Sequence, residues 1–272
     1  MKPRVQRLVR RSGLLVVALV VAALLSACLP AAPAPSPAST KGFDACAAPS
    51  LTTMSKWKAS SPYTNVGVYI GGANRGCAQP NLTASWVSSV WGQGWKLLPV
   101  WVGPQASCTT LGGATKLSSD TTTAFFQGLA EGQAAAAAAQ KLGLGWMTPI
   151  YYDMEGYTRG GACSTSVRAF ADGWVRQLNT RHLRAGMYSS LCSGILDAAA
   201  SVSDSTKVPL NAVWIAAWNN TPNIYGFGSP CPLSDTQWSN HQRVHQYVGG
   251  HNESYGGVTI NIDTNAVDAP TG

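Results

Sequence analysis

The order of strand-like and helix-like segments predicts an α/β fold, a TIM-like β/α barrel of eight strands whose last helices are reduced or missing. Eight apolar, β-branched runs bounded by turn residues follow one another after residue 40. Helical patterns separate the earlier runs, and strands that alternate with helices pair in parallel. The late connections are too short for a crossover helix. Eight strands in a chain of this length indicate a closed barrel rather than an open sheet.

Residues 1–27 are predicted to be an export signal and not part of this fold. Five basic residues precede an apolar stretch at positions 14–25, as in secretory signals. An uncleaved membrane anchor is disfavoured because the stretch is shorter than the ~20 residues that span a bilayer. It ends in Leu25-Ser26-Ala27-Cys28, which resembles the lipobox of bacterial lipoproteins, where the new N-terminal cysteine carries lipid. Arg10-Arg11 leaves twin-arginine export open.

Residues 28–40 are predicted to be the lipidated Cys28 followed by a Pro- and Ala-rich tether. Four prolines stand among alanines and serines at positions 29–40, a composition that favours an extended chain over a core. At ~3.1 Å per residue, this segment would reach up to ~37 Å. We therefore expect residues 41–272 to form a domain held on the outer face of the cytoplasmic membrane, facing the cell wall.

The cysteines support export. Assigning Cys28 to lipid leaves six of the seven cysteines, which is consistent with three disulfides in an oxidising compartment. Spacing leaves their pairing open. No two cysteines have the C-x-x-C spacing of a zinc or redox site, and we expect no metal and no cofactor.

The charge balance excludes one class of partner. Five of the 19 Lys and Arg residues lie in the signal, so the remainder nearly balances the 12 acidic residues. A net charge of about +2 gives no case for nucleic-acid binding. The low charged content, 11%, indicates a neutral polar surface, which suits sugars but is also ordinary for exported proteins.

Each predicted element follows from a local pattern. The clearest helix begins at Asp120, an expected N-cap, passes through the alanines 134–139 and stops at Gly143. Further helices are predicted at 165–181 and 193–201, whereas 219–240 is loop-like and 248–258 has room only for a Gly-rich turn. The predicted strands are 42–46, 65–71, 96–102, 148–155, 185–189, 212–218, 244–248 and 258–263.

Two carboxyl groups close the fourth predicted strand. Asp153 and Glu155 end the run 148–155, and side chains two apart in a strand share a face, roughly 6.5 Å apart. Ionising both side by side is unfavourable, so one pKa should rise relative to the other. One charged and one protonated carboxyl is the division of labour that glycoside cleavage needs.

Two more carboxyl groups are expected at the same mouth of the barrel. Asp44 ends the first predicted strand and Asp263 the last. In a closed barrel these strands are neighbours, and the C-terminal strand ends carry catalytic residues. Either residue alone would more simply accept backbone N–H groups of a loop, but four carboxyls at one mouth favour a site.

Short motifs at these strand ends carry a resemblance to a known family. They are Gly42-Phe43-Asp44, Tyr152-Asp153-Met154-Glu155, Gln246-Tyr247 and Ile262-Asp263-Thr264-Asn265. In this order they resemble the glycoside hydrolase family 25 muramidases, which cleave the muramic-to-glucosamine linkage of peptidoglycan in a barrel of five β/α units followed by three strands. From Lys41 to Asp268 the chain is still more similar to the exported glycoside-hydrolase-like barrel domains of actinobacteria.

The resemblance implies a role for each carboxyl. Glu155 would be the general acid that protonates the glycosidic oxygen, and Asp153 would assist the substrate's own acetamido group as it attacks the anomeric carbon. This substrate-assisted route is an exception to the two-carboxylate scheme. Asp44 and Asp263 would hold this pair by hydrogen bonds and tune its pKa values.

Polar and aromatic residues near strand ends are the candidates for binding substrate. Aromatic rings there can stack on sugar faces, although most tryptophans of a barrel serve packing. The histidines His241, His245 and His251 have no acidic partner at metal-ligand spacing and are interpreted as ordinary polar residues. The substrate-binding candidates are Tyr69, Trp101, Tyr188, Trp218, Gln246 and Tyr247.

Two functions from different classes are compatible with these features. The first is a membrane-tethered glycoside hydrolase that acts on a cell-envelope polysaccharide, with peptidoglycan as the expected polymer. The second is a catalytically inactive barrel that binds envelope carbohydrate in a structural or regulatory role, since one fold hosts many functions. A purely structural envelope protein would leave the four carboxyls without explanation.

Overall fold

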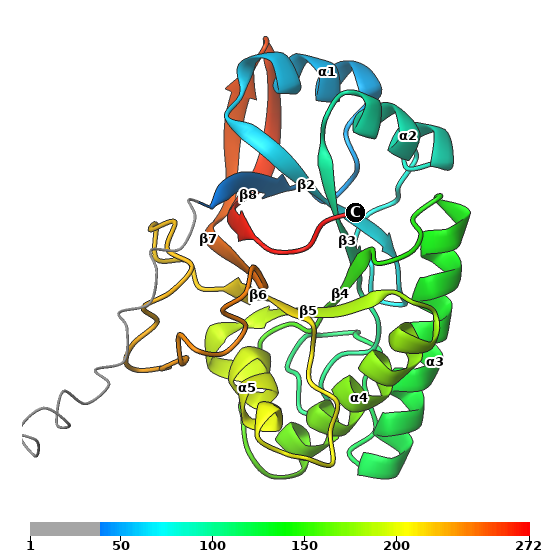
Figure 1. Cartoon of the computed structure of the whole chain (residues 1–272), viewed down its shortest axis with the longest axis vertical. Helices are drawn as coiled ribbons and strands as arrows, with labels where there is room; N and C mark the ends of the chain where they lie inside the picture. Colours follow the sequence, from blue (N-terminus) through cyan, green and yellow to red (C-terminus); the bar gives the residue numbers. More distant parts are fainter. Residues whose placement is uncertain (1–38) are drawn as a thin grey trace, which may run out of the picture. The chain divides into compact units, whose positions relative to one another are not determined.

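A computed structural model describes residues 39–272; the predicted signal, Cys28 and most of the tether lie outside the described residues. Eight strands close into one barrel in chain order (Figure 1), which confirms the predicted class. The strands are β1 Thr40–Asp44, β2 Tyr63–Gly71, β3 Lys96–Trp101, β4 Pro149–Asp153, β5 Arg184–Ser190, β6 Ala212–Ala216, β7 Arg243–Tyr255 and β8 Val258–Asp268. The helices are α1 Leu51–Ser60, α2 Ala84–Gly92, α3 Thr121–Lys141, α4 Gly161–Thr180 and α5 Leu196–Val202, with a π-helical turn, η1, at Leu191–Ile195.

The last two strands are longer than predicted, and the final one reverses direction. β1 to β7 pair in parallel, but β8 is antiparallel to both of its neighbours, β7 and β1. β7 and β8 form a long hairpin closed by Gly256 and Gly257, whose φ angles are +57° and +74°; a two-residue turn of this kind needs positive φ at both positions. The expectation that Asp263 ends the last strand is therefore wrong. Asp263 lies in the middle of β8, opposite Asp44 of β1.

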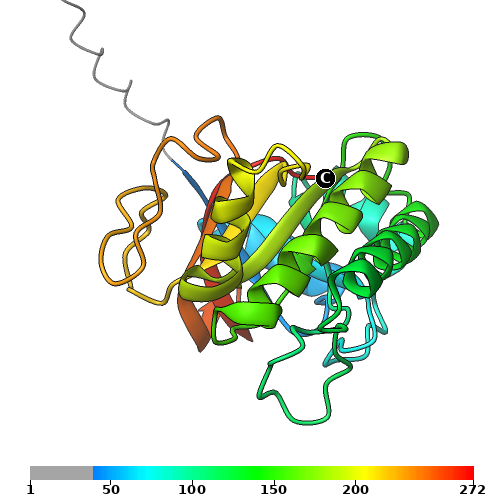
Figure 2. The same ribbon diagram turned by 90° about the horizontal axis from the view of Figure 1, so that it is seen from below.

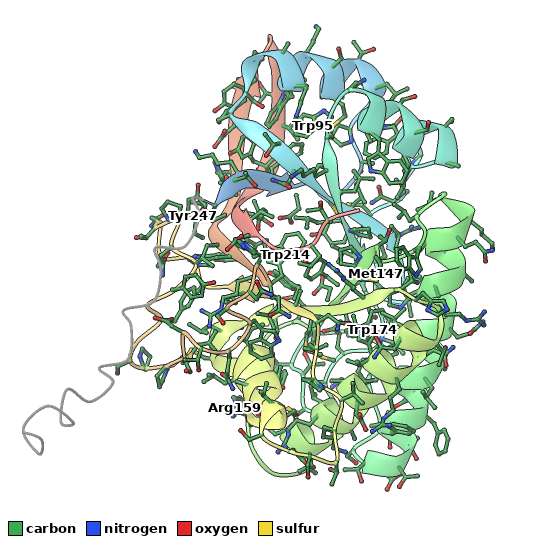
Figure 3. All side chains as sticks on the ribbon, in the orientation of Figure 1. Trp95, Met147, Arg159, Trp174, Trp214 and Tyr247 are labelled. Carbon is green, nitrogen blue, oxygen red and sulfur yellow. A yellow bond between two sulfur atoms is a disulfide. The ribbon has the colours of Figure 1, made fainter. Side chains whose placement is uncertain are left out.

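Alternate residues of each strand face the inside and the outside of the barrel. Inside, the indole of Trp214 lies edge-on to the rings of Tyr151 and Tyr188, with ring centroids 5.6 and 5.8 Å away. Figure 3 labels Trp214 within the ring of strands. Outward-facing residues such as Ile150 and Met187 join the larger core beneath the helices. The barrel interior is thus packed with side chains and is not a channel.

The longest helices are held together by close backbone approach. α3 begins after Asp120, whose carboxylate accepts from the backbone N–H of Thr123, as the predicted N-cap requires. α3 and α4 lie side by side (Figure 2). A Cβ on Gly128 would stand 2.1 Å from the carbonyl oxygen of Phe170, so only glycine allows this crossing. α4 begins four residues before the predicted 165, and α1 and α2 were not singled out by the sequence pattern.

The connection from β6 to β7 has no helix because it is built around a buried arginine. Arg243 is 0% exposed. Its guanidinium donates to the backbone carbonyls of Gln237, Ile224 and Ser234 at 2.6–3.1 Å and lies 3.6 Å from Asp235. These contacts give hydrogen-bond partners to backbone carbonyls of the 219–240 segment, which the prolines predict to be a loop. This loop covers the barrel wall where the earlier connections have a helix.

Three disulfides fix the segments that follow the C-terminal ends of strands. They are Cys46–Cys77, Cys108–Cys163 and Cys192–Cys231, so all six cysteines after Cys28 are paired, as expected. Each bridge joins segments that lie far apart in the chain. Within residues 39–272, none of the helices combines the length and the apolar character needed to cross a bilayer.

Candidate active site

Four carboxyl groups meet at one mouth of the barrel. Asp44, Asp153, Glu155 and Asp263 all line a cavity of about 370 Å³, here called the acidic pocket, together with Tyr69, Arg75, Gln105 and Leu111. β1 and β4 bring Asp44 and Asp153 there at their C-terminal ends. The antiparallel β8 brings Asp263 to the same mouth because its register places Asp263 opposite Asp44.

Asp44 and Asp263 form one carboxyl pair. The Asp44 carboxylate accepts from the Tyr69 hydroxyl (2.9 Å), the Asn265 amide (2.7 Å) and the Gln246 amide (3.3 Å). Burial nevertheless raises the pKa of Asp44 above its usual range. Burial, together with the neighbouring Asp44, raises the pKa of Asp263 to about 7. The pair therefore retains a proton up to near-neutral pH.

Asp153 and Glu155 form the second pair, and their environments differ. The Asp153 side chain is buried, and its Oδ1 has no hydrogen-bond partner. Burial, then the charge of Glu155, raises the pKa of Asp153 well above its usual range. Glu155 is exposed, two residues beyond the end of β4, and partial desolvation raises its pKa, while a hydrogen bond with Asp153 lowers it. In the free protein the shared proton therefore favours Asp153.

Gln105 fixes the backbone that carries this second pair. Its side chain is 0% exposed. Its Oε1 accepts from the N–H of Glu155 at 2.7 Å, and its Nε2 donates to the carbonyls of Asp153 (2.8 Å) and Gly103 (3.0 Å). Beyond the last strand residue, this amide holds the backbone at Glu155 together with the hydrogen bond from the Met154 N–H to the Tyr188 carbonyl (3.0 Å).

A second cavity adjoins the acidic pocket at Glu155. It has a volume of about 450 Å³ and is lined by Glu155, Tyr188, Leu191 and Trp218; it is here called the Trp218 pocket. The Trp218 indole is 65% exposed, and a Cβ on Gly249 would stand 2.8 Å from it, so the ring lies against the backbone of β7. Glu155 therefore lines both cavities.

The buried Gln246 forms hydrogen bonds to residues that line each of the two pockets. Its amide N–H donates to Asp44 and Asp263, at 3.3 Å each, and its Oε1 accepts from the Tyr188 hydroxyl (3.0 Å) and the Trp218 indole (2.9 Å). Among the substrate-binding candidates, Tyr69, Tyr188, Trp218 and Gln246 thus lie at this mouth.

The structure places the two other candidates elsewhere. Trp101 faces outward, and its indole N–H donates to Glu131 of α3. Tyr247 also faces outward and packs with Ile224 beneath the 219–240 loop (Figure 3). Both are corrections with one cause. Side chains alternate between the two faces of a strand. Trp101 and Tyr247 each directly follow an inward-facing residue, Val100 and Gln246, and therefore point outward.

Three residues of the mouth were not singled out from the sequence. Gln105 and Arg75 stand on loops that no short motif marks. Asn265 belongs to the last motif, but its role, donating to Asp44 while accepting from the Trp214 indole at 2.8 Å, depends on the β1–β8 register.

The histidines take structural positions. His245 lies between the carbonyls of Asn223 (2.6 Å) and Ala217 (2.8 Å), His241 contacts Asp268, and His251 contacts Glu253. Across residues 39–272, no cluster of His, Cys, Asp or Glu side chains has the arrangement of a metal site.

Comparison with protein families identifies the chain. The family model described as Rv2525c-like, glycoside hydrolase-like domain matches residues 55–267. The chain belongs to this family. The match covers every strand from β2 to β7 and nearly all of β8. No curated protein matches the sequence.

Solved structures share the fold of this Rv2525c-like domain. The Tat-secreted protein Rv2525c of Mycobacterium tuberculosis, in complex with L-tartrate, superposes with a TM-score of 0.52 at 13% identity over 86% of this chain and 98% of that one. The spore cortex lytic enzyme SleM of Clostridium perfringens gives 0.54 at 15% identity, over 86% and 68%. The modular autolysin LytC of Streptococcus pneumoniae gives 0.53 at 14% identity, over 84% and 46%. At these identities the likeness concerns the fold alone.

Proposed function

We propose that this protein is a muramidase-like glycoside hydrolase that acts on a cell-envelope polysaccharide, with peptidoglycan as the substrate. The observation that carries this proposal is the pair at the end of β4. Glu155 is exposed between two pockets, and Asp153 beside it is buried with an unpartnered Oδ1. The fold shared with a cortex lytic enzyme and an autolysin supports the same class of polymer.

The pair divides the labour of substrate-assisted hydrolysis. A sugar that fills the pockets removes water from Glu155 and so favours its protonated form, because burial disfavours the charged form. The N–H of the sugar's acetamido group can donate to the free Oδ1 of Asp153, which favours the charged form of that residue. The proton that the free pair holds on Asp153 is thereby transferred to Glu155.

Bond cleavage then follows in two steps. The acetamido carbonyl oxygen attacks the anomeric carbon while Glu155 gives its proton to the glycosidic oxygen, and the C–O bond to the leaving sugar breaks. This leaves a cyclic oxazolinium ion, whose positive charge lies next to the Asp153 carboxylate. Glu155, now a base, takes a proton from water, and the water oxygen attacks the same carbon, so the acetamido group is regenerated.

The remaining residues of the mouth support this chemistry. Asp44 and Asp263 line the same pocket as the pair and share a proton, which keeps the total negative charge of the acidic pocket low. Trp218 offers an exposed indole face in the neighbouring pocket, where a sugar can stack. We also propose that the protein is exported and held at the membrane through a lipid on Cys28; three disulfides are typical of an exported protein.

Cleavage and binding can be tested separately with purified peptidoglycan. Wild type is expected to release reducing ends, and Glu155→Gln is expected to release none while it still binds the polymer. Asp120→Asn is the matched control, because it also changes a carboxylate to an amide, but at an exposed N-cap where Asn serves as well as Asp. A wild-type protein that binds the polymer and releases nothing would favour the alternative, a non-catalytic carbohydrate-binding barrel.

A further inference from the structure

One cation stands at the rim of the acidic pocket. Arg75 lines this pocket together with the four carboxyl groups. Among residues 39–272, no ion pair or side-chain hydrogen bond involves its guanidinium, whereas Arg159, Arg168 and Arg243 each contact a carboxylate. An arginine that is not used within the fold, at the edge of a substrate pocket, has its five N–H donors available to a ligand.

The backbone on both sides of Arg75 is fixed. On one side, the Asn74 amide donates to the carbonyls of Gly103 (2.9 Å) and Thr115 (3.0 Å) and accepts from the N–H of Thr115. On the other side, Cys77 is bonded to Cys46 just beyond β1. The loop backbone at Arg75 is therefore held in place, and binding a ligand has to order only the side chain of Arg75.

The start of this loop leaves no room for any side chain. Gly72 has φ +106°, and a Cβ there would stand 2.1 Å from the carbonyl oxygen of Val102. Its backbone approach to the end of β3 sets the position at which the loop carrying Arg75 leaves the barrel.

We propose that Arg75 binds a carboxylate carried by the glycan and so makes the protein selective for an acidic polymer. A guanidinium binds a carboxylate through two parallel hydrogen bonds, with more geometric specificity than an ammonium. Without Arg75, a pocket lined by four carboxyl groups would repel such a substrate. The inference rests on the proposed function for its site, and it adds the chemical group of the substrate that the site recognises.

Two positions of the carboxylate share this chemistry. It belongs either to a lactyl group on the sugar ring or to a peptide stem attached to it. Three glycan fragments distinguish them: one with stems, one stripped of stems that keeps the lactyl carboxylate, and one whose carboxyl groups have been reduced to alcohols.

Binding is measured in the Glu155→Gln background, so that no turnover is required. Arg75→Gln is expected to weaken binding of a carboxylate-bearing fragment about tenfold, as for the loss of a partly exposed charge-assisted contact, and to leave the reduced fragment unaffected. Arg75→Lys should fall between, because it keeps the charge and loses the fork. Arg181→Gln, a surface arginine whose guanidinium contacts only Gln133 among the described residues, is the control and should change nothing. Unchanged thermal unfolding shows that each variant is folded.

The outcomes separate the two proposals. A tenfold loss with the stem-free fragment assigns the lactyl carboxylate, and a loss confined to the stem-bearing fragment assigns the stem. An equal loss with all three fragments, or none with any, overturns the inference. Carboxylate-selective binding through Arg75 in a wild-type background that never releases reducing ends would support the inference and refute only the proposed catalysis.

Discussion

Truncating Gln105 to alanine tests whether one buried amide positions the Asp153 and Glu155 pair. The side chain is 0% exposed and makes three hydrogen bonds to backbone groups, those of Glu155, Asp153 and Gly103. Each bond contributes about 1 kcal/mol net, and each buried group left without a partner costs a further ~1–3 kcal/mol. Water entering the space would satisfy some of these groups. The expected loss is therefore about 3 kcal/mol of unfolding free energy.

The loss should be visible in both stability and turnover. For a domain of this size, about 3 kcal/mol corresponds to a fall in Tm of about 6–12 °C. Because a displacement of about 1 Å at a catalytic group can cost ~100-fold in rate, kcat on peptidoglycan should fall about 100-fold while KM changes little. Gln133→Ala, at an exposed position of α3, is the matched control for thermal unfolding and for rate. A Gln105→Ala protein that keeps its kcat when folded would refute the positioning role.

Three further substitutions probe the same mouth. Asp153→Asn removes a buried carboxyl whose pKa burial raises well above its usual range, so Tm at pH 7 should rise while reducing-end release falls at least ~100-fold; a fall in Tm would contradict this. For Asp263, the folded-state pKa of about 7 exceeds the unfolded value of ~3.9. Between these values the folded protein holds a proton that the unfolded chain has lost. Stability therefore falls as pH rises from ~4 to ~7. The Tm advantage of Asp263→Asn over wild type should therefore grow across this window and then level off, and a constant difference would count against the shared proton. Trp218→Ala should weaken glycan binding about tenfold, or ~1.4 kcal/mol, with a fall in Tm of only about 2–4 °C for the lost hydrogen bond to Gln246. Trp146→Ala, at an even more exposed indole, should bind normally, and equal effects on binding would remove the stacking role.

Much of the fold could be predicted because its signals are local. Apolar runs mark the strands, Asp120 marks the start of α3, and the prolines of 219–240 mark a segment without a helix. The second half of β7, residues 249–255, was not predicted as a strand because it is polar. Its side chains project beyond the packed barrel and are mostly not buried, so no apolar pattern marks it.

Residues of the candidate site could be predicted where their place at a strand end brings them to the mouth. They could not be predicted where contacts with distant segments bring them there. Asp44 and Asp153 follow from being the last residues of their strands. Asp263 reaches the same mouth only through antiparallel pairing with β1, which no local pattern reveals. Trp101 also stands at a strand end, but its side chain is on the outer face of β3 and contacts α3 instead of the mouth. Gln105 reaches the site through hydrogen bonds to a distant strand end, and Arg75 lines the pocket only because the closed fold brings its loop there.

The division of labour between Asp153 and Glu155 can be tested most directly by following the anomeric configuration of the first product. Proton NMR, recorded as wild type hydrolyses a soluble peptidoglycan fragment, distinguishes the newly formed anomer before mutarotation. Two displacements at the same carbon, first by the acetamido oxygen and then by water, predict that the configuration is retained. A product of inverted configuration would contradict the account, because it requires a single attack by water with no part for the acetamido group.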